Sequence, residues 1–244
     1  MDLDYIYIDD IKIGIYKHGP VGIGASGGAD SAILLYILMT NVKEHIHIYN
    51  MMAEWRRPAL EKHFDSVVKT CSELSGNINY TVHKQYVEPD ESAEYYINML
   101  TESLDKKEID IVYLGLTNFP PKSVWEQWPG QQPEWHNNFR SDEIEHPVFG
   151  FDIPVSVAED FKTVPLTIDG NPIDKLSIDT RAYIPLFNHN KKDIVRLYKT
   201  LNVEERLFPV SRSCEDDSHP NSHCGKCWWC NERLWAFGYL GDEK

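Results

Sequence analysis

Apolar and polar residues alternate at the start of the chain. Apolar side chains occur from Tyr5 to Ile8 and again from Ile11 to Ile15. Alternation of this kind is typical of half-buried strands, and the intervening Asp9-Asp10 favours a tight turn. We therefore expect a β-hairpin in this segment.

Beyond the hairpin, short apolar runs alternate with segments in which apolar residues recur at helical spacing. The runs are predicted strands, and they cover Val21–Ala25, His45–Tyr49, Ile78–Val82 and Ile109–Leu114. The segments between them are predicted helices, at Ala32–Leu38, Pro58–Ser75 and Ser92–Leu104. This alternation predicts an α/β fold, a doubly wound parallel sheet with helices on both faces. Ligands of such sheets bind beyond the carboxyl ends of the strands, where the strand order reverses.

The regular pattern stops at about residue 116 and returns near residue 160. This segment is rich in proline and holds Trp125, Trp128 and Trp135. Disordered segments are poor in aromatic residues, and long loops inside compact domains are often functional. We therefore expect an ordered lid or substrate wall at 116–160, with a packing flap or a homodimer surface as the alternative. A small hairpin around Asp169-Gly170 and a helix capped by Asn188 or Asn190 are predicted after it.

Composition limits the choice of function. The 244 residues, 42% of them hydrophobic, allow a main domain at 1–205 and a small C-terminal segment at 206–244. No stretch approaches about 18 consecutive apolar residues, and the first residues lack the features of a signal peptide. We therefore expect a cytoplasmic protein with no membrane partner. The net charge of −14 repels polyanions, so a small-molecule substrate is favoured over a nucleic acid.

The most informative residues are Ser26-Gly27-Gly28-Ala29-Asp30-Ser31, between the first strand of the predicted sheet and its helix. A glycine turn at a helix N-terminus presents backbone N–H groups to an anion, and glycine lets the main chain approach phosphate oxygens closely. Ser26 and Ser31 add hydroxyl donors, and Asp30 suits a magnesium ion that bridges it to phosphates. A turn whose glycines serve only the backbone is the simpler alternative, but the complete hexapeptide favours a phosphate site.

This hexapeptide is not the common P-loop, because no lysine follows Gly28. It matches the Ser-Gly-Gly-x-Asp-Ser motif of the ATP pyrophosphatases known as PP-loop enzymes. The resemblance implies that Ala25–Ser31 binds ATP and that ATP is cleaved between its α- and β-phosphates. In so acidic a chain the nucleotide needs local cations, and the candidates are Arg56, Arg57, Arg181, Lys191 and Lys192. Lysines in the first turn of a helix oppose its dipole, which is explained if Lys191 or Lys192 contacts phosphate; a solvated lysine pair is the alternative.

Four of the five cysteines form a second motif, spaced C-x9-C-x2-C-x2-C; they are Cys214, Cys224, Cys227 and Cys230. A C-x2-C pair lets two thiolates reach one ion from a tight turn, and four thiolates make a closed tetrahedral zinc site. We rank structural zinc first and an iron–sulfur cluster second. A disulfide framework is disfavoured in a cytosolic chain, and a redox dithiol leaves two cysteines unexplained. Cys71 is expected to be a buried core thiol, and His219 and His223 solvated loop residues.

Together these motifs resemble the 7-cyano-7-deazaguanine synthases, in that family's motif order, from about Val21 to Tyr239. The tail Ser213-Cys214…Cys224-Gly225-Lys226-Cys227-Trp228-Trp229-Cys230-Asn231-Glu232-Arg233 is similar to the family's Ser-Cys…Cys-Gly-x-Cys-x-x-Cys-x-x-Arg signature. Trp128–Trp135 shows a fainter similarity to the family's lid segment. The resemblance implies a Rossmann-like fold of the adenine nucleotide alpha hydrolase type, with ATP, Mg²⁺ and Zn²⁺ as cofactors.

The same resemblance implies roles for individual residues. Those expected to act in catalysis are Asp30, Ser31, Lys191 and Lys192. Those expected to contact the substrate are Gly115, Thr117, Trp128, Glu134 and Arg233.

The resemblance also implies a reaction. The family adenylates 7-carboxy-7-deazaguanine, adds ammonia, and dehydrates the resulting amide to a nitrile with further ATP. Adenylation is chemically necessary because a carboxylate is a poor electrophile. Alternatives are an enzyme that activates another small acid or couples one to a protein amine, and a tRNA-modifying enzyme that uses the same loop. The net charge disfavours the tRNA enzyme, and the complete hexapeptide disfavours a non-catalytic nucleotide-binding scaffold.

Overall fold

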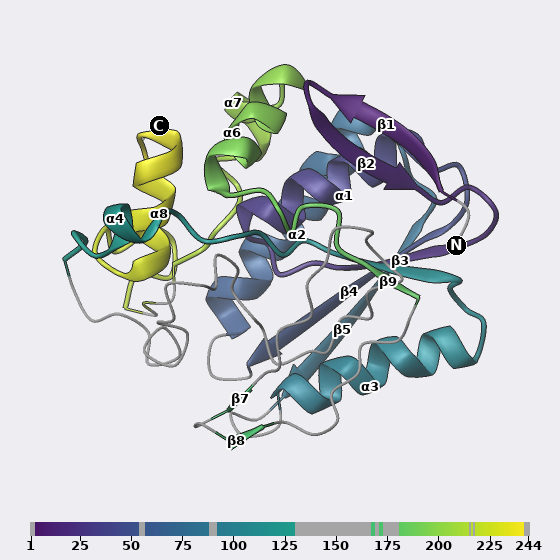
Figure 1. The fold of residues 1–244 in the computed structure, drawn as a ribbon. Coiled ribbons are helices and arrows are strands. Elements are labelled where there is room, and N and C mark those ends of the chain that lie inside the picture. Colours follow the sequence, from purple (N-terminus) through teal and green to yellow (C-terminus); the bar gives the residue numbers. More distant parts are fainter. Residues whose placement is uncertain are drawn as a thin grey trace.

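A five-stranded parallel sheet forms the centre of the molecule (Figure 1). This computed structural model describes residues 3–53, 57–87, 92–129, 167–168, 171–172, 181–214, 216 and 218–241. The strands are β3 (Val21–Gly24), β4 (Ile46–Ala53), β5 (Tyr80–Val87), β6 (Ile111–Leu114) and β9 (Ala182–Tyr183). They lie in the order β5-β4-β3-β6-β9, and every adjacent pair is parallel.

Helices cover both faces of this sheet. On one face lie α1 (Ala29–Asn41), α2 (Arg57–Ser75) and α6 (Lys191–Thr200), and on the other lies α3 (Ser92–Asp105) (Figure 1). Each face has its own apolar core: Ile46 and Ile48 of β4 point into the first, and Tyr49 of the same strand packs into the second with Leu100 of α3. The predicted doubly wound α/β class is confirmed.

The N-terminal hairpin is also confirmed. Strands β1 (Asp4–Ile8) and β2 (Ile11–Ile15) pair antiparallel, with Asp9 at the turn in a left-handed conformation (φ 55°). The apolar side of β2 is fully buried in the first core. The hairpin therefore extends the hydrophobic core without joining the central sheet.

The C-terminal segment packs against the main core. It contains α7 (Glu204–Leu207) and α8 (Trp228–Phe237), and the boundary expected between residues 205 and 206 falls inside α7. Phe237 stacks on Phe208 with ring centroids 3.6 Å apart. The short helix α4 (Lys122–Trp125) reaches the same segment, where Trp125 meets Trp228 edge to face.

The predicted lid is described only in part. Residues 130–160, and with them Glu134, lie outside the described residues. The small hairpin around Asp169-Gly170 is present as the antiparallel strands β7 (Thr167–Ile168) and β8 (Asn171–Pro172). Among the described helices, none has the length and apolar character needed to cross a bilayer.

The topology singles out one end of the sheet. Crossovers run outward from β3 to β4 and β5 on one side, and the chain then returns to β6 on the other side. The order reverses between β3 and β6, whose carboxyl ends lead into the Ser26–Ser31 loop and into Gly115. This is where the general rule for open α/β sheets places a ligand.

Candidate functional site

The Ser26–Ser31 loop is closed by its own side chains. Ser31 Oγ accepts a hydrogen bond from Ser26 N and donates one to Gly28 O, both at 3.2 Å. Gly27 has φ +84°, so a larger residue there would strain the backbone, and its Cβ would crowd the Phe64 Cα at 3.2 Å. Gly28 is the N-cap of α1 and supplies no side-chain cap. The first N–H groups of α1 are thus available to an anion.

Residues from the two strands that flank β3 hold this loop in place. Asn50, within β4, donates from Nδ2 to the carbonyl of Ala25. Gly115, directly after β6, passes so close to α1 that a Cβ on it would lie 2.8 Å from the Ser31 Cα. Gly115, expected to contact the substrate, therefore has a packing reason for being glycine.

A cavity of about 340 Å³ opens beyond the carboxyl ends of β3 and β6. This volume lies in the range of small-molecule sites, roughly 300–1,000 Å³. The loop contributes Ser26, Gly28 and Asp30, and the segment after β6 contributes Thr117 and Phe119. The lining also includes Lys191 of α6 and the C-terminal residues Arg212, Ser213, Cys214, Trp229 and Glu232. The two sequence motifs thus meet in one cavity.

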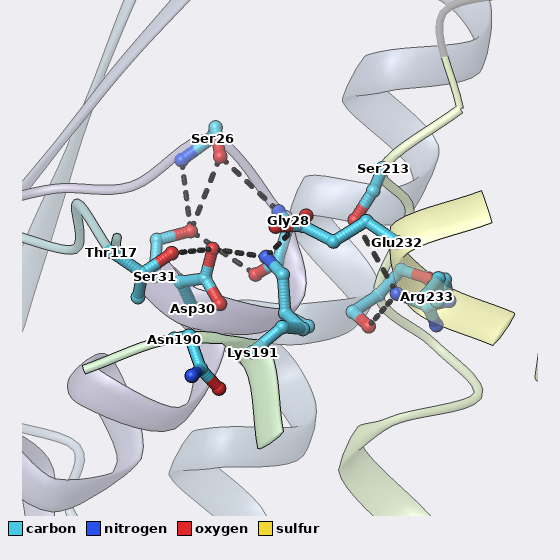
Figure 2. A network of polar contacts seen from close by, with 12 residues as sticks. Ser26, Gly28, Asp30, Ser31, Thr117, Asn190, Lys191, Ser213, Glu232 and Arg233 are labelled. Atoms are coloured by element: carbon cyan, nitrogen blue, oxygen red, sulfur yellow. Dashed lines mark hydrogen bonds and ion pairs between the residues drawn. The ribbon is translucent and has the colours of Figure 1, made fainter. Parts of the chain in front are cut away.

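Three charged side chains from three helices meet in the cavity (Figure 2). Lys191 Nζ forms an ion pair with Asp30 Oδ2 and lies 3.2 Å from Glu232 Oε2. Burial alone would lower the pKa of Lys191, but the two carboxylates outweigh it and raise that pKa. Burial raises the pKa of Glu232 to about 7, although Lys191 opposes the shift. The lysine is therefore firmly protonated among two acidic groups.

Asp30 has the features of a cation ligand. Its Oδ2 accepts a hydrogen bond from Thr117 Oγ1 at 3.3 Å, in addition to Lys191. Its Oδ1 is buried and has no hydrogen-bond partner among the described residues. A carboxylate oxygen beside a phosphate-binding turn is the kind of ligand that Mg²⁺ takes.

The two predicted lysines are placed differently. Lys191 is almost fully buried in the cavity, whereas Lys192 is exposed and lies over the Trp235 ring, 4.7 Å from its centroid. Asn190 caps α6, because its side chain accepts from Lys192 N and the Asp193 carboxylate accepts from Asn190 N. Of the two alternatives, the structure brings Lys191 to the loop.

Two residues expected to contact the substrate lie elsewhere. Arg233 is 1% exposed; its guanidinium stacks on Phe208 and donates to the carbonyls of Phe208, Ser211 and Leu240. Its donors anchor the C-terminal segment, because a buried guanidinium must be satisfied by protein acceptors. Trp128 packs on Trp228, with ring centroids 4.7 Å apart, and does not line the cavity.

The four predicted cysteines come together in one compact cluster. The Sγ atoms of Cys214, Cys224, Cys227 and Cys230 all lie within 4.8 Å of one another. One tetrahedral ion with metal–sulfur bonds of about 2.3 Å places its sulfur ligands about 3.8 Å apart, and Cys224 and Cys230 are 3.9 Å apart. The donor set fits a metal ion. Cys71 is far along the chain and fully buried, as expected, and His223 is buried although a solvated residue was expected.

Backbone N–H groups also donate hydrogen bonds to sulfur atoms of this cluster. Cys224 N donates to Cys214 Sγ and Cys227 N donates to Cys224 Sγ, both at 3.3 Å. Arg212 holds the segment from Cys214 to His219 in place, because its guanidinium donates to the carbonyls of Cys214, Asp216 and His219. Its backbone N–H donates to Gly27 O at 2.9 Å, so Arg212 connects the cysteine cluster to the Ser26–Ser31 loop.

Three of these residues were absent from the sequence-based prediction. Arg212 and Glu232 line the cavity, and Asn50 holds the loop. Arg181, which was expected to provide a cation, pairs with Asp105 at the end of α3. A polar residue at the end of a predicted buried strand is a signal that could have identified Asn50. The other two depend on how the C-terminal segment folds back, which no local pattern records.

Comparison with known proteins gives one family similarity. Residues 169–241 match the family model described as "Queuosine biosynthesis protein QueC". The match includes Lys191 and the four cysteines but not the Ser26–Ser31 loop, and it covers less than a third of the chain. No curated protein matches the chain.

One solved structure shows a weaker likeness. It is the "U34-tRNA thiolase NcsA from Methanococcus maripaludis with its [4Fe-4S] cluster", with a TM-score of 0.44 and 14% sequence identity. The match covers 94% of this chain and 74% of that one. A likeness at this level says nothing of what this chain binds. The C-terminal part of the chain, from 169 to 241, is thus similar to the QueC family.

Proposed function

We propose that this protein is an ATP-dependent, AMP-forming carbon–nitrogen ligase that activates a carboxylate. The observation that carries the proposal is the meeting of the Ser26–Ser31 loop, Asp30 and Lys191 in one cavity at the switch point of the sheet. A closed glycine turn at an uncapped helix N-terminus suits phosphate oxygens. A buried lysine beside it supplies the positive charge that an acidic protein needs to hold a nucleotide.

In this proposal the polar groups of the loop, and Lys191 beside it, have separate tasks. Ser26, Ser31 and the N–H groups of the loop hold the phosphates, and Lys191 offsets their charge. Asp30 holds magnesium, which when bound supplies charge neutralisation at the phosphates. Lys192, exposed on α6 over the Trp235 ring, remains a predicted catalytic residue.

The chemistry would proceed in two displacements. A carboxylate oxygen of the substrate attacks the α-phosphorus of ATP, and the bond from that phosphorus to the oxygen of pyrophosphate breaks. Ammonia then attacks the activated carbonyl carbon, AMP leaves with the former carboxylate oxygen, and loss of a proton gives the amide. Nitrile formation repeats the activation on the amide oxygen with a second ATP, and the loss of AMP and two protons gives the C≡N bond. Preorganised positive charge at the phosphates lowers both barriers.

The favoured acid is 7-carboxy-7-deazaguanine. Two observations support it: the QueC similarity of residues 169–241 and the aromatic side chains of Phe119 and Trp229 in the cavity wall. Aromatic faces suit a planar heterocycle. Thr117 and Gly115 lie at the same wall, and Glu134 remains a predicted contact for the donor edge of the base.

We also propose that the four cysteines hold a structural zinc ion. The sulfur separations support one tetrahedral ion, and a site with four thiolates leaves no position for a substrate. An iron–sulfur cluster is the competing outcome. Elemental analysis together with the visible absorption spectrum distinguishes the two, because zinc is colourless and an iron–sulfur cluster is not.

The central experiment incubates the purified protein with ATP, Mg²⁺, ammonium and 7-carboxy-7-deazaguanine. AMP and pyrophosphate are quantified, and the base is followed by mass spectrometry. The expected result is AMP formation that depends on the acid, with an amide or nitrile product. AMP formation with another acid or with tRNA, but not with this one, would overturn the substrate; no AMP with any acceptor would overturn the ligase.

A further inference from the structure

We propose that Glu232 is a positioning residue that holds Lys191 in the cavity when Asp30 turns to a divalent cation. The inference rests on the proposed function of this cavity as a nucleotide site. It assigns a role to Glu232, for which neither sequence motif predicted one. Figure 2 shows the arrangement: Lys191 lies between the carboxylate of Asp30 and that of Glu232.

The three side chains are brought together from separate parts of the chain. Asp30 lies in the first turn of α1, Lys191 begins α6, and Glu232 lies in α8. The side chains of Lys191 and Glu232 are 5% and 3% exposed, and that of Asp30 is 18% exposed. Glu232 is thus the inner partner of the lysine, and Asp30 is the partner that a ligand can reach.

Lys191 needs a partner in every state of the site. An ammonium group that is buried without a counter-ion carries a large desolvation cost. While the cavity holds no cation, Asp30 and Glu232 share this role. When Asp30 ligates a cation its charge is taken up by that ion, and the ion repels Lys191. Among the described residues that line the cavity, Glu232 is then the remaining acidic group.

The same geometry predicts what removal of the Glu232 charge does. Lys191 would pair with Asp30 alone, and a divalent cation would have to compete with the full ion pair. Cation binding would weaken, and the KM for ATP with magnesium would rise. Turnover at saturating substrate would change less, because Asp30, Lys191 and the loop remain.

The decisive measurement is cation binding without turnover. Mn²⁺ is titrated by electron paramagnetic resonance into the purified protein with its cysteine site loaded, for the wild type, Glu232→Gln and the exposed-residue control Glu205→Gln. We expect Glu232→Gln to weaken Mn²⁺ binding by about tenfold, a typical size for coupling between contacting charges. The KM for ATP should rise in the same proportion and exceed the change in kcat, whereas Glu205→Gln should match the wild type.

A double-variant comparison separates positioning from direct ligation. In the Lys191→Met background, Glu232→Gln should weaken Mn²⁺ binding much less than it does when the lysine is present. An equal loss in both backgrounds would overturn the proposal, because Glu232 would then act on the cation without Lys191.

Two further variants keep the result interpretable. Asp30→Asn should abolish this Mn²⁺ binding; unchanged binding would overturn the inference, because the cation would lie elsewhere. If Glu232→Gln yields no folded protein, Glu232→Asp keeps the charge but withdraws it from Lys191, and wild-type Mn²⁺ affinity in that variant would overturn the role. The absence of AMP formation alongside these Mn²⁺ effects would sink the ligase proposal and leave the role of Glu232 standing.

Discussion

Helices α1 and α8 begin in nearly the same way, and α6 begins differently. The N-cap of α1 is Gly28 (φ −74°, ψ 165°) and that of α8 is Cys227 (φ −71°, ψ 164°); neither has a side-chain cap. A left-handed glycine lies shortly before each of them: Gly27 (φ 84°) one residue before the first N-cap, and Gly225 (φ 73°) two residues before the second. Helix α6, in contrast, is closed by the reciprocal hydrogen bonds of Asn190 and Asp193.

The difference shows at which helix N-termini the backbone N–H groups are left without a side-chain cap. A helix leaves its first N–H groups without partners, and these must be met by a side chain, water or a ligand. At α8 the group met is a cysteine sulfur, since Cys227 N donates to Cys224 Sγ. At α1 the same backbone geometry faces the cavity, with hydroxyls and Asp30 around it. Both turns present backbone donors, and in the proposed function the side chains around each turn select a metal ion or phosphate.

The largest effect is expected from Cys227→Ser, which removes one sulfur of the cysteine cluster at the start of α8. The loss of a structural zinc is worth on the order of 10 kcal/mol in peptides, so we expect the free energy of unfolding to fall by several kcal/mol. Metal content is measured by elemental analysis and stability by thermal unfolding. Cys71→Ala is the matched control, because Cys71 is buried in the main core and is not a member of the cluster, and this variant should keep its metal. A Cys227→Ser protein with unchanged metal would remove this residue from the site.

The corresponding change at α1 is Asp30→Asn. Loss of the carboxylate should reduce ATP-dependent AMP formation by about 100-fold or more, the scale of one removed electrostatic group in a preorganised site. Fold and metal content should be retained. Asp105→Asn is the control, because it removes an exposed carboxylate that pairs with Arg181 at the far end of α3. AMP formation by Asp30→Asn at the wild-type rate would show that the loop does not serve ATP.

The sequence predicts the two turns and the helix after the first of them well because their signals are local; helix α8 after the second turn was not predicted. The hexapeptide at Ser26–Ser31, the C-x2-C pairs and the strand–helix alternation each lie within a few residues, and all appear where expected. Boundaries were less certain: the third predicted strand begins at Tyr80 and extends to Val87, because β5 follows β4 along its whole length.

The contacts between distant segments could not be predicted in this way. Arg233 and Glu232 are neighbours in α8, yet one anchors the C-terminus and the other enters the cavity. Which side of α8 meets Lys191 depends on how the C-terminal segment packs on α6, and no short-range pattern contains that information. The same applies to Arg212, whose backbone N–H donates to Gly27 of the Ser26–Ser31 loop while its side chain donates to the carbonyl of Cys214.

Gly115→Ala tests the α1 side of this comparison, because it displaces the start of α1 without replacing any residue of the Ser26–Ser31 loop. The added Cβ would lie 2.8 Å from the Ser31 Cα and 2.9 Å from its N, so the start of α1 must shift. Overpacking of this kind costs about 1–3 kcal/mol, and the displaced loop should raise the KM for ATP. Chemical denaturation and steady-state kinetics measure the two effects.

Gly76→Ala is the matched control for that variant. Gly76 has φ +72° and open space around its Cβ position, so alanine there strains only the backbone. Its stability should fall by a comparable amount while the KM for ATP stays the same. An unchanged KM in Gly115→Ala would mean that the position of Ser31 does not matter for the nucleotide.

The smallest expected effect comes from Asn190→Ala, which makes α6 resemble α1 by removing its cap. Loss of an asparagine N-cap costs about 1 kcal/mol, measurable by denaturant unfolding. Asn221→Ala, at an exposed loop asparagine that accepts from Lys62, is the control and should cost less. If the cap of α6 serves only folding, the loss of binding free energy for ATP and for Mn²⁺ should be no larger than the loss in the free energy of unfolding. A much larger loss of binding would mean that the N-terminus of α6 itself takes part in the site, and the distinction between capped and uncapped helix ends would then fail.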